Sequence, residues 1–266
     1  MNESVATTDT TATAAATRIY TLSELMVCAA AREIRDGEVV FVGMRLPLVA
    51  FVVAKKTHAP RAIGLFENGV VRATPAAELI YTMADPPNIL GATQCLDMLS
   101  MMSLLQSGRV DLGFLGAAEV DRFGNLNSTR VTGKDMVRLP GSGGACDIAS
   151  LAKRFVVLLE HDKRRLPERV SYVTSPGYGD GKGWRERVGL PRGGPSAVIT
   201  TKAVLRFCDH GEAFLASVHP GVSVNDVVAK TGWKLRLAER VEVTPEPAAA
   251  ELTAIREYDK KGFWTK

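Results

Sequence analysis

The 266-residue chain is 46% hydrophobic and carries 33 Lys and Arg against 29 Asp and Glu, a net charge of +4. This length and hydrophobic content predict a folded protein with a large buried core. The small, dispersed positive charge argues against a nucleic-acid-binding surface. The chain contains no run of the roughly 18 apolar residues that a membrane-spanning helix needs, so a membrane protein is also disfavoured.

The four cysteines lie far apart, form no Cys-x-x-Cys pair and have no histidine at ligand spacing. The pattern predicts no metal site and no disulfide framework, and a reducing cytoplasm is the simplest location. Residues 1–19 are rich in Thr and Ala and lack the basic start and apolar centre of a signal peptide. We expect a disordered tail there, followed by a single domain over residues 20–266.

The first elements predict a strand–helix–strand unit. Thr21 and Glu24 form a capping box at the start of a helix over 22–36, where apolar residues recur at helical spacing. An apolar run at 39–42, a helix-like stretch at 46–54 and a second apolar run at 62–66 follow. Two strands joined in this way run parallel, with a right-handed crossover.

The later segments continue the alternation and then change character. After Gly183 the apolar runs follow one another with short gaps, which is typical of a β meander. The sequence therefore predicts an α/β fold: an open, largely parallel sheet flanked by helices, with an appended β meander in the C-terminal part. The remaining predicted elements are strands at 111–117, 154–160 and 169–174, helices at 94–106, 223–232 and 246–258, and short strands at 196–201, 203–208 and 212–218.

Glu67 is the first candidate for chemistry. It follows the second predicted parallel strand and precedes the turn Asn68-Gly69. Open α/β sheets bind ligands at the carboxyl edge of such strands. An isolated carboxylate entering a turn is more often simply solvated, so position alone leaves both interpretations open.

The glycine-rich segment Gly-Ser-Gly-Gly-Ala at 141–145 is the second candidate, because it precedes a predicted helix that begins near Asp147. Closely spaced glycines let backbone N–H groups converge on a phosphate or on the oxyanion of an acyl-transfer intermediate. Taken alone, such a loop is more often a plain turn. The chain lacks the nucleotide-binding glycine patterns and the Gly-x-Ser-x-Gly elbow of serine hydrolases.

Three motifs in fixed order resemble family I coenzyme A transferases, above all the β subunit of glutaconate CoA-transferase. They are Gly-Leu-Phe-Glu-Asn-Gly at 64–69, Gly-Ala-Ala-Glu-Val-Asp-Arg-Phe-Gly-Asn at 116–125 and the 141–145 segment. The resemblance implies that Glu67 attacks the acyl-CoA thioester and carries CoA as a glutamyl thioester. It also implies an oxyanion and CoA-binding loop made of Gly141, Ser142, Gly143, Gly144 and Ala145.

The same resemblance implies substrates and partners. The substrates are an acyl-CoA and a carboxylic acid, with no permanently bound cofactor, metal or flavin. An α-type subunit is the expected partner, in αβ units that assemble further and hold the active site near their junction. Asn68, Gly69 and Glu119 are expected to line the site, and Arg45 or Arg130 to pair with the distal carboxylate of a dicarboxylate such as glutaconate.

The sequence departs from the family at two positions. Glu119 stands where the family often has Gln, and Phe66 where many members have Ser. If Glu119 lies close to Glu67, repulsion between the two carboxylates raises the pKa of one of them and provides a general base.

A general base at this position would favour a reaction other than CoA transfer. Some relatives of this fold hydrolyse a carbon–carbon bond in a CoA thioester, and others decarboxylate a CoA thioester. Those hydrolases and decarboxylases look as though they lack the nucleophilic glutamate, so the presence of Glu67 favours a transferase. A ligand-binding regulatory module is disfavoured further, since the N-terminal tail is too short for a helix-turn-helix unit.

Overall fold

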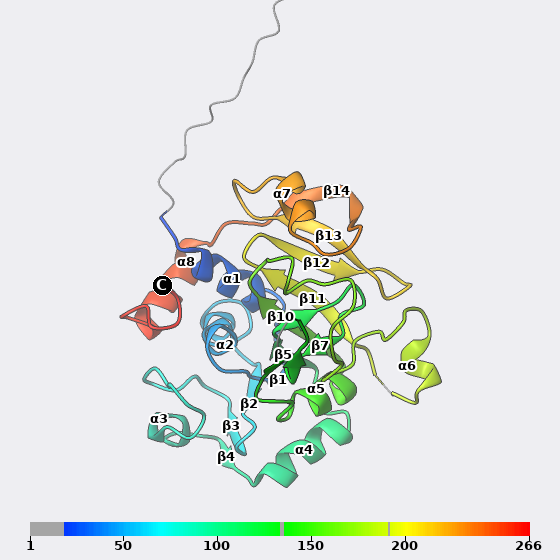
Figure 1. The fold of residues 1–266 in the computed structure, drawn as a ribbon. Coiled ribbons are helices and arrows are strands. Elements are labelled where there is room, and N and C mark those ends of the chain that lie inside the picture. The colour runs from blue at the N-terminus through cyan, green and yellow to red at the C-terminus, as the bar shows by residue number, and fades with distance from the viewer. Residues whose placement is uncertain (1–18, 134–135, 191) are drawn as a thin grey trace, which may run out of the picture.

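The computed structural model describes residues 19–133, 136–190 and 192–266, so nearly all of the predicted tail lies outside the described residues. Its centre is a ten-stranded sheet in the order β14-β13-β12-β11-β10-β5-β1-β2-β3-β4 (Figure 1). No helix in the described part of the chain is long and apolar enough to cross a membrane.

The middle of the sheet is parallel, as predicted. It comprises β1 (Val39–Phe41), β2 (Ile63–Leu65), β5 (Leu112–Gly116), β10 (Arg154–Leu159) and β11 (Pro195–Thr200). These strands are rich in Val, Leu, Ile and Phe because both faces of the sheet are covered. The chain moves from β1 outward to β2 and later returns to β5 on the other side of β1. Strand order therefore reverses between β1 and β5, where open α/β sheets bind ligands.

Helices cover both faces of the sheet and make three layers (Figure 1). One face is covered by α1 (Leu22–Ala31), α2 (Leu46–Lys56) and α8 (Ala249–Tyr258). The other is covered by α4 (Met98–Gln106), α5 (Ala145–Leu151) and α7 (Val224–Ala229). Two short helices, α3 (Pro86–Ile89) and α6 (Trp184–Arg187), lie in connections.

The predicted capping box of α1 is confirmed, but its predicted end is not. The Glu24 N–H donates to the Thr21 hydroxyl at 3.1 Å, and the Thr21 N–H donates to the Glu24 carboxylate at 2.8 Å. The helix ends at Ala31 rather than at residue 36. Ile34 is buried and lies four residues after the buried Ala30, which is the spacing of one more helical turn, although the helix has already ended.

Antiparallel pairs extend the sheet at both ends. At one edge β3 (Val70–Arg72) and β4 (Gln94–Cys95) follow β2. At the other, β12 (Ala203–Phe207) and β13 (Ala213–Val218) form the predicted meander, and β14 (Arg236–Val243) pairs parallel to β13. Two small hairpins stand between β5 and α5: β6 (Glu119–Val120) with β7 (Leu126–Asn127), and β8 (Arg130–Val131) with β9 (Val137–Arg138).

Two predicted elements need correction. The predicted strand at 169–174 is wrong: this segment is bent, and Ser171 hydrogen-bonds to Glu119 of the β6–β7 hairpin. Its apolar residues Tyr172 and Val173 are exposed, so the apolar run does not mark a core strand. The predicted helix at 94–106 begins only at Met98, because residues 94–95 extend the sheet first.

Candidate active site

Glu67 lies just beyond β2, at the carboxyl edge of the parallel strands. A tight turn fixes it there, since the Gly69 N–H donates to the Phe66 carbonyl and the Phe66 N–H donates to the Val70 carbonyl, both at 2.9 Å. Gly69 has φ +102°, and a Cβ at this position would lie 1.8 Å from the Leu96 carbonyl oxygen. The turn therefore requires glycine and lets the 93–97 segment pack directly against it.

The structure brings Glu67 and the glycine loop together. The Gly144 N–H donates to Glu67 Oε1 at 3.1 Å, across 77 residues of sequence. A Cβ on Gly144 would lie 3.1 Å from the same oxygen, so the absence of a side chain permits the approach. Helix α5 begins at the next residue, and N–H groups in a first helical turn lack intrahelical acceptors.

The rest of the loop is fixed by local hydrogen bonds. The Ser128 carbonyl accepts from the Gly141 N–H, and the Ser128 hydroxyl donates to the Gly141 carbonyl, both at 2.8 Å. The Ser142 hydroxyl accepts from the Cys146 N–H at 3.0 Å. The N–H of Gly143 makes no hydrogen bond within the described ranges, and a Cβ built on Gly143 would lie 3.8 Å from Glu67 Oε1. The loop thus has a second backbone N–H without a partner at the residue next to Gly144.

The other residues predicted to line the site have partners of their own. Glu119 is buried, and its carboxylate accepts from the Asn127 amide at 2.6 Å and from the Ser171 N–H and hydroxyl at 2.9 Å each. No hydrogen bond links Glu119 to Glu67 among the described residues. The Asn68 amide donates to the Met83 carbonyl at 2.7 Å, which ties the turn to the following loop.

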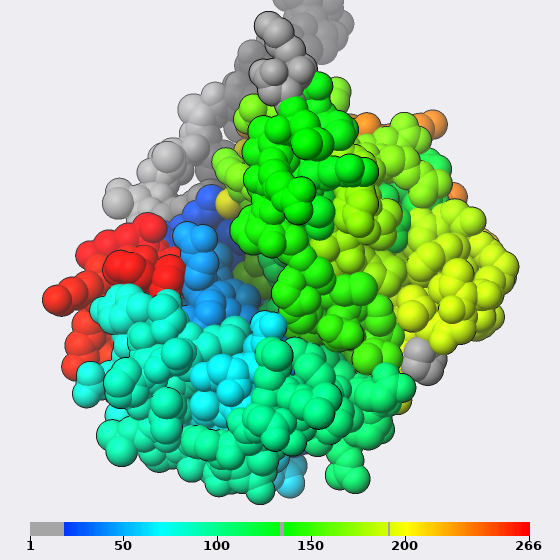
Figure 2. Space-filling model, turned by 60° about the horizontal axis from the view of Figure 1, so that its bottom comes forward, coloured from blue at the N-terminus to red at the C-terminus, as the bar shows by residue number. Residues whose placement is uncertain are grey.

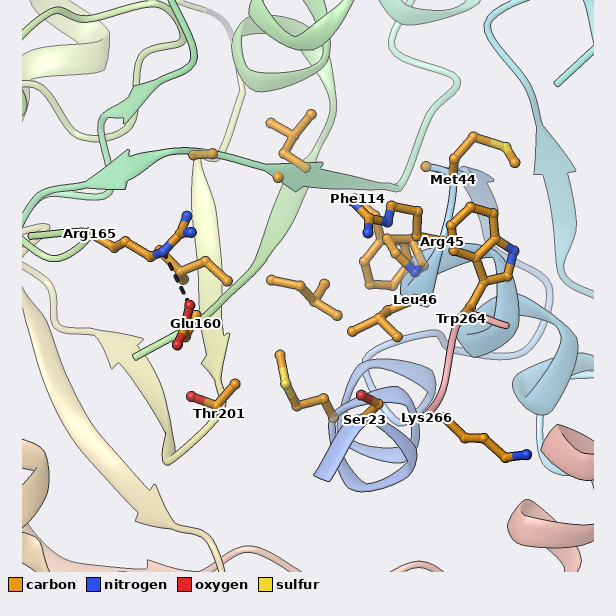
Figure 3. A pocket seen from close by; sticks show the side chains of 18 residues that line it. Ser23, Met44, Arg45, Leu46, Phe114, Glu160, Arg165, Thr201, Trp264 and Lys266 are labelled. Atoms are coloured by element: carbon orange, nitrogen blue, oxygen red, sulfur yellow. Dashed lines mark ion pairs between the residues drawn. The ribbon is translucent and has the colours of Figure 1, made fainter. Parts of the chain in front are cut away.

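A cavity of about 630 Å³ opens at the same edge of the sheet, beyond the ends of β1, β5 and β10 (Figure 3). Figure 2 shows it as a hollow between the blue segment that follows β1 and the green segment that contains the small hairpins. Phe41 pairs with Leu65 across β1 and β2, and extending this register sets Gly43 opposite Glu67. Gly43 lines the cavity whereas Glu67 does not, so the carboxylate stands beside the cavity and not inside it.

The two predicted arginines are separated. Arg45 lines the cavity at the start of α2, with its guanidinium 5.5 Å from the ring centre of Trp264. Its φ of +69° and ψ of −125° are strained for a residue with a side chain. At the other end of the cavity Arg165 pairs with Glu160 at 3.5 Å (Figure 3). Arg130 lies outside the cavity lining, 4.9 Å above the Tyr172 ring.

Sequence reasoning missed Trp264 as a cavity residue. It comes from the C-terminal segment, 219 residues from Arg45, and its indole N–H donates to the Ile80 carbonyl at 3.3 Å. An aromatic residue near a chain end carries no pattern that assigns it to a particular strand edge. The nearness of Arg45 to Trp264 arises only from tertiary packing of α8 on α2.

His161 follows β10 at the carboxyl edge of the sheet and is buried. Its ring nitrogens contact the Thr200 hydroxyl at 2.9 Å and the Val227 carbonyl at 3.2 Å. Burial lowers the pKa of His161 from 6.5 to about 4, outweighing the hydrogen bond to Val227. The folded protein therefore holds a neutral histidine that the unfolded chain would protonate.

We expect the free energy of unfolding to fall as pH drops from about 6.5 to 4, since the unfolded state binds the extra proton in this range. The full contribution of His161 is present above pH 6.5, and its loss is on the order of 3 kcal/mol. Urea unfolding at several pH values measures it. His161→Gln should flatten this part of the profile, whereas His210→Gln, at an exposed site, should not. Identical profiles for all three proteins would contradict the assignment.

Residues 24–230 match the family model of coenzyme A transferase. The β subunit of 3-oxoadipate CoA-transferase from Pseudomonas knackmussii is 39% identical over 89% of this chain and 92% of that protein. The β subunit of glutaconate CoA-transferase from Acidaminococcus fermentans is 34% identical over 88% and 91%. The crystal structure of that enzyme superposes with a TM-score of 0.86 at 31% identity, over 93% of this chain and 98% of the matched one.

A further similar structure is that of the decarboxylase AibA/AibB, with a TM-score of 0.79 and 28% identity over 92% of this chain and 97% of the matched one. The family match covers most of the chain, and the two transferase subunits exceed 30% identity along nearly their whole lengths. The protein therefore belongs to the coenzyme A transferase family, and within it resembles the β-type subunits.

Proposed function

We propose that this chain carries the covalent chemistry of a CoA transferase, with Glu67 as the nucleophile. The observation that carries the proposal is the hydrogen bond from the Gly144 N–H to Glu67 Oε1, because it joins the carboxylate to a loop of backbone donors. Glu67 Oε2 has no hydrogen bond within the described ranges, which leaves it free to attack. The half-buried carboxylate also lies at the sheet edge where this fold binds ligands.

The reaction exchanges bonds without water or redox change. The Glu67 carboxylate adds to the thioester carbonyl, and expulsion of CoA thiolate leaves a mixed anhydride. The thiolate then attacks the glutamyl carbonyl, which releases the first carboxylate and forms the glutamyl-CoA thioester. A second carboxylate repeats the two steps in reverse and leaves as the new acyl-CoA, with Glu67 regenerated. Each tetrahedral oxyanion needs donors: the Gly144 N–H already contacts Glu67, and the preceding residue, Gly143, is our candidate for a second donor.

The enzyme is proposed to work as a complex with an α-type subunit, since each transferase relative is named as one of the subunits of its enzyme. An αβ unit that assembles further is the arrangement we propose, without a permanently bound cofactor. The free cysteines fit a reducing cytoplasm, where CoA thioesters are made and used.

A dicarboxylic acid is the proposed substrate class. Both transferase relatives are named for acids with two carboxylates, 3-oxoadipate and glutaconate. Arg45 supports this class, because its guanidinium lines the cavity and has no carboxylate partner in the part of the chain that the structure describes. Guanidinium groups bind carboxylates in a two-pronged geometry. Arg165, by contrast, is already paired with Glu160.

Arg45→Ala is expected to raise the KM for a dicarboxylate by roughly 10- to 100-fold, which corresponds to the loss of one charged hydrogen-bonding partner. A monocarboxylate of equal length should be affected little. Alanine retains the Cβ, so the backbone strain at this position is unchanged. Steady-state kinetics with both acids measure the difference, and Arg130→Ala serves as the control. An unchanged KM for the diacid in Arg45→Ala would remove Arg45 from the site.

The function is tested by intact-protein mass spectrometry of the chain, purified with its α-type subunit, after incubation with acyl-CoA and then borohydride. Borohydride reduces a glutamyl thioester to an alcohol, so a CoA-dependent mass change should map to Glu67. Turnover of substrate without any such change would instead favour hydrolysis or decarboxylation, the chemistry for which the AibA/AibB structure is named.

A further inference from the structure

The segment that follows α8 is a tight turn held by one buried carboxylate. Asp259 is 3% exposed. Its carboxylate accepts from three consecutive backbone N–H groups, those of Phe263, Trp264 and Thr265, at 2.7, 2.8 and 3.1 Å. The Thr265 hydroxyl donates to the same carboxylate at 3.0 Å. A buried carboxylate requires such donors, and here all of them come from one short stretch of chain. Asp259 therefore fixes the conformation of the turn.

Two further hydrogen bonds tie the turn to distant parts of the chain. The Thr21 hydroxyl donates to the Thr265 carbonyl at 2.6 Å, which joins the turn to the start of α1. The Trp264 indole N–H donates to the Ile80 carbonyl at 3.3 Å. Trp264 is therefore held at its backbone by Asp259 and at its ring by Ile80.

The ring of Trp264 lies against the Arg45 guanidinium, with the guanidinium carbon 5.5 Å from the ring centre. The two residues lie together at the end of the cavity away from Arg165 (Figure 3). An aromatic ring attracts a guanidinium group at this distance and leaves its edge N–H groups available to a carboxylate. The Arg45 side chain makes no hydrogen bond and no ion pair within the described ranges. It is a cation that is held in place but has no acidic partner there.

The backbone of Arg45 is constrained as well. Its φ of +69° is positive, which among the described residues is otherwise seen only at glycines. Backbone strain of this kind occurs at ligand clamps, where the surrounding structure enforces it. The backbone thus fixes the direction of the side chain, and the Trp264 ring holds its far end. A guanidinium ordered in advance loses less conformational entropy when a ligand binds.

One short segment connects Trp264 to the nucleophile. The Ile80 carbonyl accepts from Trp264, and three residues later the Met83 carbonyl accepts from the Asn68 amide at 2.7 Å. Asn68 follows Glu67 directly. The same segment therefore supports the turn of the reacting carboxylate and the ring that holds the guanidinium, so it helps to set the spacing between the two.

We propose that Trp264 is a specificity-determining residue, which holds the Arg45 guanidinium in position for the distal carboxylate of the acid substrate. Asp259 is a positioning residue that acts through Trp264. The inference rests on the proposed substrate class, a dicarboxylic acid bound by Arg45, and it adds the residues that make Arg45 selective.

The test is steady-state kinetics of the complex with the α-type subunit, at a fixed acyl-CoA concentration, with glutaconate or 2-pentenoate as the acceptor. The two acids differ only in the distal carboxylate. Trp264→Ala should raise the KM for glutaconate by roughly 3- to 30-fold and leave kcat and the KM for 2-pentenoate within a few-fold. Trp264→Phe retains an aromatic face, so it should restore the KM for glutaconate to within about 3-fold of wild type.

A double-mutant cycle separates this role from packing. If Trp264 acts through the guanidinium, Trp264→Ala should have no further effect on the KM for glutaconate in an Arg45→Ala background. Asp259→Asn replaces one acceptor oxygen with a donor that faces backbone N–H groups, so it should raise the KM for glutaconate in the same way. It should add nothing to the effect of Trp264→Ala.

The matched control is Phe263→Ala. The Phe263 ring packs edge-on against Trp264 at 4.6 Å but does not line the cavity. Its removal leaves the hydrogen bonds of Trp264 to Asp259 and Ile80 in place. Thermal melting should show comparable losses for Phe263→Ala and Trp264→Ala, whereas only Trp264→Ala should change the preference between the two acids.

Several outcomes would overturn the inference: no rise in the KM for glutaconate in Trp264→Ala, an equal rise for both acids, the same rise with and without Arg45, or an equal loss of preference in Phe263→Ala. The proposed substrate class would survive each of these if Arg45→Ala alone raises the KM for glutaconate. An unchanged KM in Arg45→Ala would refute the substrate class and this inference together. The covalent adduct at Glu67 forms from acyl-CoA without the acceptor acid, so it should appear in every variant and tests the nucleophile separately.

Discussion

Glu67→Ala should lower CoA transfer by on the order of 10⁴-fold or more and remove the covalent thioester, because no other group replaces the lost acyl acceptor. The structure gives a reason to expect little change in stability. Glu67 makes one described hydrogen bond, to the Gly144 N–H, and no ion pair within the described ranges. Initial rates, combined with mass spectrometry after borohydride, measure both effects on the complex with the α-type subunit.

Glu119→Gln is the matched control for that experiment. Glu119 also lies near the carboxyl edge of the sheet, but its carboxylate accepts from Asn127 and Ser171. An amide of the same shape keeps an acceptor for these bonds, so we expect activity within a few-fold of wild type and an intact adduct at Glu67. Loss of transfer in Glu119→Gln comparable to that in Glu67→Ala would give Glu119 a chemical role. Full activity of Glu67→Ala would dismiss the covalent route.

Much of the fold follows from local patterns that tertiary structure does not override. The capping box at Thr21 and Glu24 begins a helix in both the prediction and the structure. The parallel strands β1, β2, β5 and β10 are short apolar runs bounded by polar or glycine residues, and burial on both faces requires that composition. The apolar run at 169–174 has the same appearance but lies exposed over a hairpin. Apolar content alone does not distinguish a core strand from a covering loop.

The candidate site could be predicted only in part. Each of its two elements has a local signature: a carboxylate after a strand, and glycines before a helix. The contact between Glu67 and Gly144 depends on the path of two hairpins between β5 and α5, which no short-range pattern specifies. The same applies to Trp264 beside Arg45 and to the hydrogen bonds that hold Glu119. These contacts join segments far apart in sequence, and packing of whole elements decides them.

Gly144→Ala tests the contact itself and should lower kcat by roughly 10- to 100-fold. The new Cβ would lie 3.1 Å from Glu67 Oε1 and 3.0 Å from the Met102 methyl, closer than ordinary van der Waals contact. The carboxylate must therefore move by a few tenths of an ångström, away from the donor that orients it. Gly144 has φ −77°, which alanine adopts without strain, so the melting temperature should stay near that of wild type.

The kinetic signature separates positioning from binding. If the glycine is needed for the geometry of attack, kcat for acyl transfer falls while the KM for acyl-CoA stays within a few-fold, and the glutamyl thioester accumulates more slowly in rapid-quench experiments. A rise in KM with unchanged kcat would instead mean that the loop serves mainly to hold CoA. In that case the orientation of Glu67 by residue 144, whose N–H alanine retains, would not limit the rate, and the lack of a side chain at this position would serve to admit CoA.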